Sequence, residues 1–394
     1  MTFSVLKDKQ KVFTFLWFFT PALAGFLKGR LGEVNNYKIF KGVFHHLVDG
    51  QNLYSLYPQE YFDCNHYGPV FSLIIMPFTF LPDIIGIPLW NCLQAYALYR
   101  ALLLLPIKPT YQWIVLALCL VDLNTSAHSA QVNPTVVAFI ILSWYFVKKD
   151  QVIWATLFVM IGAFVKLYGI VGLAFWVFSE SKLKYIAYTF FWVIVLLLLP
   201  MLISSPSFVL HSYLDWYNSL VEKNLQNQEV VNGMGASMQD VSLMGLVRRI
   251  GGFPHLSNLF FLIPGLILQV LPLLRFKQYS SLIFQLRYLA SLAIFVVIFS
   301  SSSESPTFII AVAGVAIWFV SQDYPIQKWV WVLLFNVVLV TSLTATDIFP
   351  NWLRMKIILY SIKAFPCCLV WFACIYQLLL DEISEFKTLW LNQD

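Results

Sequence analysis

Charged side chains are scarce in this sequence, and their scarcity excludes most soluble folds. Lys, Arg, Asp and Glu make up 11% of the 394 residues, while 59% are hydrophobic and the mean hydropathy is +0.74. Ordinary soluble domains carry about 25% charged residues. A water-soluble core cannot absorb this much apolar side chain, so the composition indicates a protein embedded in a membrane.

The sequence also lacks a cysteine framework and a metal-binding spacing. Five of the six cysteines lie in or beside apolar runs, and Cys64 stands alone in a polar stretch. No disulfide pattern follows from these positions. His45, His46 and His66 share the same polar stretch, but their spacing matches no zinc signature. We therefore predict no metal and no cofactor.

Neither a basic face nor a strand-like alternation is present. The 25 Lys and Arg, against 20 Asp and Glu, are scattered in small clusters, which disfavours nucleic acid as a partner. The long unbroken apolar runs exclude the alternating pattern of a barrel. A segment in hydrocarbon must then satisfy its own backbone hydrogen bonds as a helix. We expect an all-α, polytopic integral membrane protein.

Apolar windows recur along the chain. About 20 such residues span a hydrocarbon core of about 30 Å, and we expect roughly ten to thirteen transmembrane helices. The clearest windows begin near Val12, Ile84, Ile186, Leu256, Leu282, Phe308, Lys328 and Ser361, and shorter ones near Val70, Tyr111, Val132, Val152 and Leu167.

The orientation follows from the first window. Lys7, Lys9 and Lys11 precede it, so the positive-inside rule puts the N-terminus in the cytoplasm. The window lacks a small-residue cleavage site and is interpreted as a retained helix rather than a signal peptide. We expect a multi-pass protein of the cytoplasmic (inner) membrane, with the orientation of its later helices left open.

Two long polar segments interrupt the apolar pattern, 29–67 and 204–254. Connections between helices usually run to about 2 to 8 residues, and longer ordered loops tend to carry function. We expect one domain, residues 1–394, with both segments as long extracytoplasmic loops.

An amphipathic helix is predicted within the first segment. The apolar residues Tyr37, Phe40, Phe44 and Leu47 recur at helical spacing, which indicates a helix lying on the membrane surface. Gly50 marks its expected end, because glycine is typical just past a helix C-terminus.

Short motifs follow one another after this helix. They are Gly50-Gln51-Asn52-Leu53-Tyr54, Asn65-His66-Tyr67-Gly68-Pro69, Ala130-Gln131-Val132-Asn133-Pro134, Lys166-Leu167-Tyr168 and the segment from Gln239 to Arg249. In this order they resemble the polytopic GT-C glycosyltransferases of family GT87, also called DUF2029. The resemblance covers most of the chain and rests on the succession of motifs rather than on one of them.

The resemblance implies a GT-C-like helix bundle and a cell-envelope enzyme. Members of that family are usually mannosyltransferases or related enzymes that take a sugar from a polyprenyl phosphate. We therefore expect transfer of a hexose, with mannose as the expected sugar, to a lipid-linked or cell-surface glycan acceptor. The partners would be membrane lipids, the donor and a glycan or glycolipid acceptor. The donor is a substrate, so no cofactor is implied.

Such a transfer needs a carboxylate that removes a proton from the acceptor hydroxyl. When Phe40 is aligned with the aromatic of the family's Asp-x-x-x-Tyr motif, Asn36 occupies the position of the catalytic Asp, and an amide is no base. The same segment offers four substitutes, Glu33, Asp49, Glu60 and Asp63. Asp63 is favoured because it stands four residues before Tyr67, and its alternative is a solvated loop charge.

Cations are also needed around the departing phosphate. Lys166 lies between two apolar runs, and an ionisable residue at membrane depth hints at function. Its alternative is a lysine that snorkels from a helix end. Arg248 and Arg249 suit a lipid phosphate or, equally, serve as interfacial anchors that meet anionic lipid in general.

The remaining candidates are polar groups at motif positions. Gln131 and Asn133 are expected to bind sugar hydroxyls, or else to cap or join helices. His66, Tyr67 and Tyr168 are substrate-binding candidates through the resemblance. Glu304 follows Ser300–Ser303 and is a second carboxylate of interest, or part of a plain turn.

Two rival functions stay open. With Asn36 in place of the acid, the chain is alternatively a catalytically inactive partner that binds lipid phosphate or glycan. A carrier or flippase for a lipid-linked sugar ranks third, since it predicts charged pairs near the bilayer midplane and pseudo-symmetric halves, neither of which is plain in the sequence.

Overall fold

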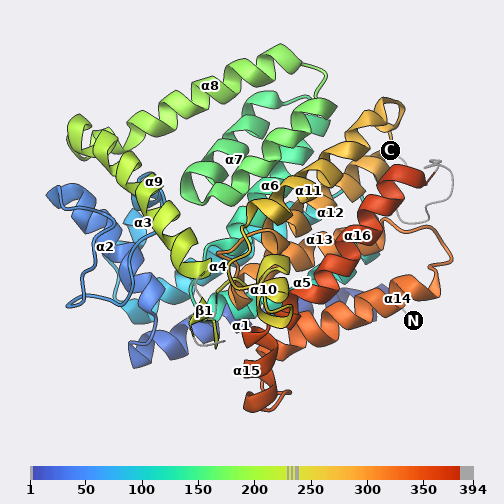
Figure 1. Ribbon diagram of the computed structural model, residues 1–394, viewed down its shortest axis with the longest axis horizontal. Coiled ribbons are helices and arrows are strands. Elements are labelled where there is room, and N and C mark those ends of the chain that lie inside the picture. The colour runs from blue at the N-terminus through green and yellow to red at the C-terminus, as the bar shows by residue number, and fades with distance from the viewer. Residues whose placement is uncertain (1–2, 229, 232–233, 236–238, 382–394) are drawn as a thin grey trace. The chain divides into compact units, whose positions relative to one another are not determined.

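The computed structural model describes residues 3–228, 230–231, 234–235 and 239–381 (Figure 1). Its regular structure in these ranges is helical except for one short antiparallel hairpin, β1 (Val230–Val231) paired with β2 (Met234–Gly235). The all-α expectation is therefore confirmed. The chain folds as two compact units: unit 1 is Met1–Leu103, Leu123–Leu173 and Ser181–Val221, and unit 2 is Leu104–Asp122, Ala174–Glu180 and Glu222–Asp394.

Unit 1 holds the helices of the first half of the chain. They are α1 (Phe3–Leu31), α2 (Asn35–Asp49), α3 (Phe71–Thr79), α4 (Asp83–Leu103), α6 (Asn133–Lys148), α7 (Val152–Val165), α8 (Lys182–Leu198) and most of α9 (Pro206–Gln228). Short 3-10 segments follow two of them, at Leu167–Phe178 and Leu199–Leu202.

Unit 2 holds most of α5 (Pro109–His128) and the helices of the second half. These are α10 (Leu243–Ile250), α11 (Leu259–Val270), α12 (Leu282–Ile298), α13 (Phe308–Val320), α14 (Lys328–Asn336), α15 (Asn351–Leu359) and α16 (Phe365–Leu380). A π-helix, Val337–Ser342, continues α14, and 3-10 turns occur at Leu271–Leu274, Phe276–Gln278, Ser305–Thr307, Leu343–Ala345 and Ile362–Ala364.

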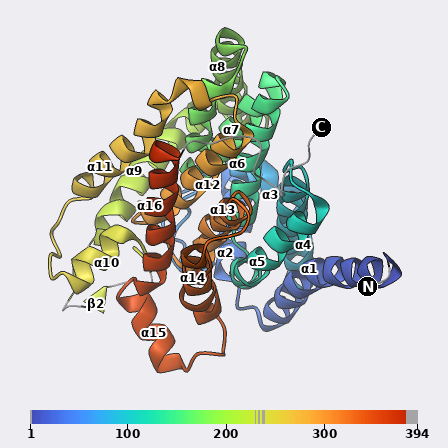
Figure 2. The same cartoon turned by 90° about the vertical axis from the view of Figure 1, so that its right-hand side faces the viewer.

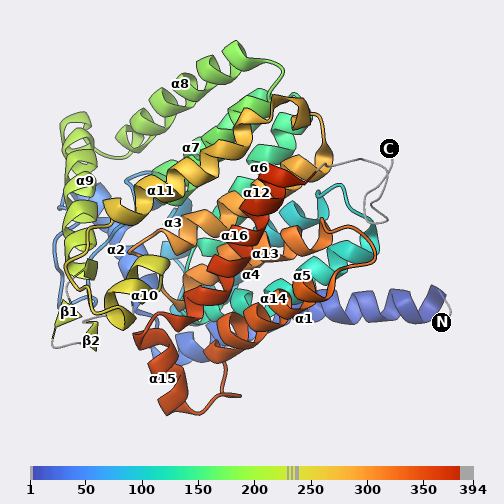
Figure 3. The ribbon, with the colours of Figure 1, turned by 45° about the vertical axis from the view of Figure 1, so that its right-hand side comes forward.

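Neighbouring helices in each unit pack along much of their length. In unit 1, α1 packs on α4, α4 on α6, and α6, α7 and α8 follow one another, as the green helices of Figure 3 show. In unit 2, α12 packs on both α13 and α16 (Figure 2). All seventeen residues of α12 except its first are buried, which is typical of a helix that is apolar on every side.

Four helical segments of the described residues are long and apolar enough to cross a membrane: Gln10–Leu31, Lys182–Leu202, Lys328–Ala345 and Ile362–Leu380. Six shorter apolar helices accompany them. The protein is therefore polytopic and membrane-embedded, while the count of ten to thirteen spans stays a prediction.

The helix predicted in the first polar segment forms, and Gly50 ends it with a positive φ of 67°. Its apolar stripe does not face a membrane, however, because Tyr37 and Leu47 are 0% exposed and Phe44 is 8% exposed. The helix packs on α3 instead. The protein itself therefore covers the stripe, and the position of α2 at the membrane surface stays a prediction.

Two expectations need correction. The segment 204–254 was expected to be a loop, but it contains α9 and α10. Lys11 lies inside α1, which begins at Phe3, and so it does not precede the first helix. In both cases the sequence continues with helix-compatible residues beyond the apolar window, and apolar content alone does not mark where a helix ends.

Candidate functional site

A tight turn in unit 1 presents the motif Asn65–Pro69. The Asn65 side chain closes this turn: its Nδ2 donates to the Tyr67 carbonyl at 3.0 Å, and its Oδ1 accepts from the Tyr67 N–H at 3.0 Å. Such an Asx turn needs a short side chain that carries both donor and acceptor. The Tyr54 hydroxyl also donates to the Tyr67 carbonyl, at 3.0 Å, so the turn is held at both ends.

Gly68 joins this turn to the C-terminal end of α7. Its backbone N–H donates to the Val165 carbonyl at 3.3 Å. A Cβ at position 68 would stand 2.0 Å from the Phe164 carbonyl oxygen, so only glycine permits the approach. The motif 65–69 therefore lies directly beside the residue that follows Val165, which is Lys166.

Lys166 is the first residue beyond α7 and has extended backbone angles. Its Nζ donates to Asn133 Oδ1 at 2.8 Å and lies 4.8 Å from the centre of the Tyr168 ring. Asn133 Nδ2 in turn donates to Gln131 Oε1 at 2.9 Å. The structure thus brings together four predicted residues from two motifs, with the ammonium group partly exposed.

Asn36 of α2 contacts the same region of unit 1. Its Nδ2 donates to the Ser129 carbonyl at 2.9 Å, next to Ala130, whose φ is positive at 49°. The carbonyl of Ala130 accepts from Trp90 Nε1 at 2.8 Å. The turn that leads into Gln131 is therefore held on both sides by side-chain donors.

Asp63 and His66 lie at the start of the motif turn. Asp63 has a φ of 67°, and its Oδ1 accepts from the Cys64 N–H at 2.9 Å. His66 Nδ1 contacts the Ser219 hydroxyl at 2.9 Å, and His66 Nε2 stands 3.9 Å from Asp63 Oδ1. Asp63, His66 and Tyr67 thus share one short segment with Gly68.

Glu60 has a different setting. Its carboxylate lies 3.2 Å from Nε2 of His46, a buried ring that stacks on Tyr57 with centroids 3.9 Å apart. Burial raises the pKa of the neighbouring Tyr61 hydroxyl, and the Glu60 charge adds to the shift. Glu60 is therefore engaged in holding the loop 50–62 on α2.

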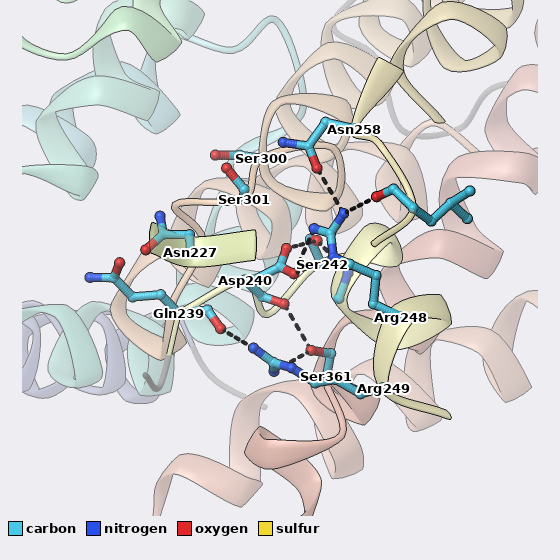
Figure 4. A network of polar contacts seen from close by, with 12 residues as sticks. Asn227, Gln239, Asp240, Ser242, Arg248, Arg249, Asn258, Ser300, Ser301 and Ser361 are labelled. Carbon is cyan, nitrogen blue, oxygen red and sulfur yellow. Dashed lines mark hydrogen bonds and ion pairs between the residues drawn. The ribbon is translucent and has the colours of Figure 1, made fainter. Parts of the chain in front are cut away.

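The two predicted arginines lie in unit 2, in the polar network of Figure 4. Arg248 is 1% exposed. Its Nε and Nη2 donate to Asp240 Oδ2 at 3.2 and 2.7 Å, and its Nη1 donates to Asn258 Oδ1 and the Leu256 carbonyl at 2.9 and 3.0 Å. This guanidinium is shielded from solvent and occupied by protein acceptors.

Arg249 ties the same loop to the C-terminal end of α15. Its Nη1 donates to the Ser361 hydroxyl at 2.8 Å and to the Leu359 carbonyl at 3.0 Å, and its Nη2 donates to the Gln239 carbonyl at 2.7 Å. The Ser361 hydroxyl then donates to the Asp240 carbonyl at 2.8 Å. Arg249 remains half-buried rather than closed off.

Opposing effects act on the ionisation of the Asp240 carboxyl. Burial raises its pKa, while the Arg248 and Arg249 guanidinium groups and the Ser242 hydroxyl lower it. Burial also lowers the pKa of Arg249. The short bidentate contact favours the ion pair, because ionised partners with several hydrogen bonds compensate each other's lost hydration.

The serine-rich segment 300–303 meets this loop within unit 2. Backbone N–H groups of Asp240 and Val241 donate to the carbonyls of Ser301 and Ser303 at 3.0 and 2.8 Å. The Ser301 hydroxyl donates to Asn224 Oδ1 at 2.6 Å. Two segments singled out separately in the sequence therefore form one polar layer.

Glu304 follows that layer and caps a helix. Its backbone N–H donates to the Thr307 hydroxyl at 3.3 Å, and its carboxylate accepts from the backbone of Thr307 in a reciprocal capping box. This matches the plain-turn alternative for Glu304, because a capping box is a local device for starting a helix.

Two buried ionisable side chains of unit 2 escaped the sequence predictions. Asp122 of α5 and Lys363, just before α16, are each 0% exposed and lie near enough for each to affect the ionisation of the other. Thr341 of the π-helix donates its hydroxyl to the Lys363 carbonyl at 2.8 Å. The signal was available, since each is an isolated ionisable residue in an apolar run.

Apolar helices long enough to cross a membrane place this protein among polytopic membrane proteins. The sequence model of glycosyltransferase family 87 matches residues 65–342 of the 394. The chain therefore belongs to glycosyltransferase family 87, which confirms the family expected from the motifs. No curated protein matches the chain. The family match begins at Asn65, so Asn36, Glu60 and Asp63 precede it.

Proposed function

We propose that this protein transfers a hexose, mannose, from a polyprenyl phosphate to a lipid-linked or cell-surface glycan acceptor. Family membership supports glycosyl transfer in general. The observation that carries the finer proposal is the chain of contacts from Lys166 through Asn133 to Gln131. It combines one positive charge with two amides beside the motif turn 65–69.

Lys166 is the group proposed to bind the leaving phosphate. A lysine ammonium is a compact charge suited to phosphate oxygens, and Asn133 fixes its position. Tyr168 restricts it from the other side. Gln131 is the amide proposed to orient the hexose through its hydroxyls, while Asn133, 0% exposed and engaged through both of its amide atoms, holds Lys166 and Gln131 in place. The Tyr67 and Tyr168 rings offer apolar surface beside the sugar.

Asp63 is the proposed base. As the acceptor oxygen forms its bond to the anomeric carbon, the bond from that carbon to the phosphate oxygen breaks, and the acceptor proton passes to the Asp63 carboxylate. The phosphate departs with the bonding electrons and is stabilised by Lys166. His66 lies beside Asp63 and is held by Ser219, so it positions the carboxylate.

The two arginines, Glu304 and Glu60 have structural roles in this proposal. Arg248 is excluded from phosphate binding because Asp240 and Asn258 occupy it. Arg249 holds the loop 239–249 in place, and Glu304 caps the turn that leads into α13. Glu60 is retained as a partner of His46.

The test is an assay of the full-length protein in lipid nanodiscs with polyprenyl-phosphate-mannose and a glycolipid acceptor fraction. Asp63→Asn is expected to lower turnover by about 10²- to 10⁴-fold, the usual contribution of a general base, with donor binding retained. Lys38→Met, an exposed lysine of α2, is the matched control. Normal turnover in Asp63→Asn would remove it from the mechanism.

A catalytically inactive partner that binds lipid phosphate or glycan is the second candidate. It is favoured by Asn36, which stands at the family's acid position and is engaged by Ser129. Under this alternative Asp63→Asn, Glu60→Gln and Glu304→Gln would each bind donor like the wild type, and no variant or wild type would show turnover. Any turnover by the wild type would contradict the inactive-partner alternative.

A carrier or flippase is the third candidate, and the buried Asp122 and Lys363 pair supports it. Proteoliposomes loaded with a labelled donor lipid discriminate it. Movement of the lipid between leaflets that is lost in Asp122→Asn, without any glycosyl product, would favour the carrier. Product formation without movement would favour the transferase.

The proposed topology places the N-terminus in the cytoplasm and the motif turn outside the inner membrane. Cys64 is a half-exposed thiol of that turn. A membrane-impermeant maleimide added to intact cells is expected to label it, and Cys64→Ser is expected to lose the label. Labelling that requires broken cells would reverse the orientation.

A further inference from the structure

Three side chains with different donor atoms meet in the segment 63–66 of unit 1. Asp63 offers a carboxylate oxygen, Cys64 a sulfur and His66 a ring nitrogen, and these atoms all lie within 4.8 Å of one another. His66 Nε2 is 3.7 Å from Cys64 Sγ and 3.9 Å from Asp63 Oδ1. Their spacing along the chain matches no known zinc signature, so only the folded turn reveals the cluster.

The histidine tautomer is set from outside the cluster. The hydroxyl of Ser219, on α9, donates its hydrogen to the Asn65 carbonyl at 3.3 Å. While that hydrogen bond is formed, the Ser219 oxygen, 2.9 Å from His66 Nδ1, acts as the acceptor for Nδ1–H. In a neutral imidazole the lone pair then sits on Nε2, the atom that faces the sulfur and the carboxylate. Metal-binding histidines are commonly oriented through their other nitrogen in this way.

The distances are close to those of a formed site. Tetrahedral zinc with bonds of about 2.0–2.3 Å places its ligand atoms about 3.4–3.6 Å apart. The separations of 3.7 and 3.9 Å from His66 Nε2 exceed this by a few tenths of an ångström, and the Cys64 and Asp63 donor atoms lie within 4.8 Å of each other. The Asp63 side chain is 47% exposed and that of His66 24% exposed, so both are accessible to solvent.

We propose that Asp63, Cys64 and His66 bind one Zn²⁺, with water or substrate as the fourth ligand. Thiolate and imidazole ligands suit zinc rather than Mg²⁺ or Ca²⁺, which prefer oxygen. Binding would occupy the Asp63 carboxylate. If the proposed function holds, Zn²⁺ therefore inhibits transfer by removing the base, and this regulatory part rests on that function.

The test of binding uses the purified full-length protein in nanodiscs with a thiol-free reductant. Co²⁺ is added as a spectroscopic probe, and Zn²⁺ is then titrated to displace it. We expect one Co²⁺ per chain with a thiolate-to-cobalt absorption band, and complete displacement by Zn²⁺. Cys64→Ser is expected to lose the band, and Asp63→Asn and His66→Gln to weaken binding more than 100-fold.

Two further variants separate a built site from casual thiol binding. Ser219→Ala removes the hydrogen bond that sets the tautomer, and about a 10- to 100-fold loss of affinity is expected. His45→Ala removes an exposed histidine of α2 and should bind like the wild type. Equal affinity in wild type and His66→Gln, or the absence of the cobalt band from the wild type, would overturn the site.

The regulatory part is read as the ratio of turnover with and without Zn²⁺ within each variant. Wild type is expected to lose at least tenfold in turnover at saturating Zn²⁺, and Cys64→Ser to lose its sensitivity. Metal binding without inhibition would refute Asp63 as base and leave the zinc site standing. Turnover in the wild type without metal binding would refute the zinc site alone.

Discussion

Lys166 in unit 1 and Arg248 in unit 2 are both cations that the sequence offered for a phosphate, yet their surroundings differ. Lys166 is partly exposed, and its ammonium donates to Asn133 Oδ1 and lies over the Tyr168 ring. The Arg248 guanidinium is 1% exposed and meets a carboxylate, an amide and a carbonyl. Of these two cations, Lys166 is the more exposed to solvent.

The difference shows that two cations in similar sequence contexts can have different roles, depending on how deeply each is buried. A buried charge needs a full set of partners, because removal from water costs several kcal/mol per ion. A charge at a helix end keeps part of its hydration and can exchange it for a phosphate oxygen. Arg248 therefore organises the loop 239–249, and Lys166 is the group to test for chemistry.

The largest effect is expected when the buried pair is broken. Arg248→Met leaves the Asp240 carboxylate without its partner and should lower the free energy of unfolding by about 3–5 kcal/mol. Denaturant unfolding in detergent, followed by tryptophan fluorescence, measures the change. An unfolding free energy equal to that of the wild type would contradict the structural role.

The matching control removes both charges. In Arg248→Met with Asp240→Leu no buried charge is left unpaired, and such replacements are often close to neutral. The double variant should therefore be more stable than Arg248→Met alone. If the two losses simply add, the pair does not interact as described.

Lys166→Met is expected to have the next largest effect, on catalysis and not on folding. Loss of one group that stabilises developing charge typically costs about 10²- to 10³-fold in kcat. The thermal midpoint should stay close to that of wild type because the side chain is partly exposed. A large drop in stability with unchanged kcat would make Lys166 resemble Arg248 and abolish the contrast.

Gly68→Ala tests whether the motif turn must touch α7. The added Cβ would meet the Phe164 carbonyl at 2.0 Å, and overpacking of this kind costs about 1–3 kcal/mol. Stability and kcat should fall together. Gly32→Ala and Gly50→Ala are not equivalent controls, because both glycines have a positive φ.

Asn133→Ala is expected to give the smallest effect. Removing a hydrogen bond to a charged group costs about 1.5 kcal/mol, or about tenfold in kcat. Kinetics of the Asn133→Ala and Lys166→Met double variant provide the check. Once Lys166 is absent, Asn133→Ala should have little further effect, and full additivity would mean that the two residues act separately.

Helix positions were largely predictable because hydrophobic windows and helix-ending residues such as glycine are recognised within a short stretch of sequence. The windows expected near Val132, Val152 and Leu282 correspond to α6, α7 and α12, and Gly50 ends α2 as expected. The contacts among Lys166, Asn133 and Gln131 were foreseeable only as motif positions. Their distances depend on how α6 and α7 pack.

What the sequence did not predict depends on tertiary packing. The apolar stripe of α2 has the same sequence pattern whether it faces lipid or α3, since both neighbours are apolar. The role of Arg248 depends on Asp240, and the turn before α10 is what brings that carboxylate to the guanidinium. Asp122 and Lys363 are far apart along the chain, and no local pattern links them.

The hydrogen bond of Asn36 determines what an Asn36→Asp substitution would do. The amide nitrogen points at the Ser129 carbonyl from 2.9 Å. A carboxylate placed there would set oxygen against oxygen and push α2 away from the turn that precedes Gln131. Asn36 thus joins α2 to the backbone before Gln131, and an acid at this position would loosen that contact before it supplied any proton acceptor.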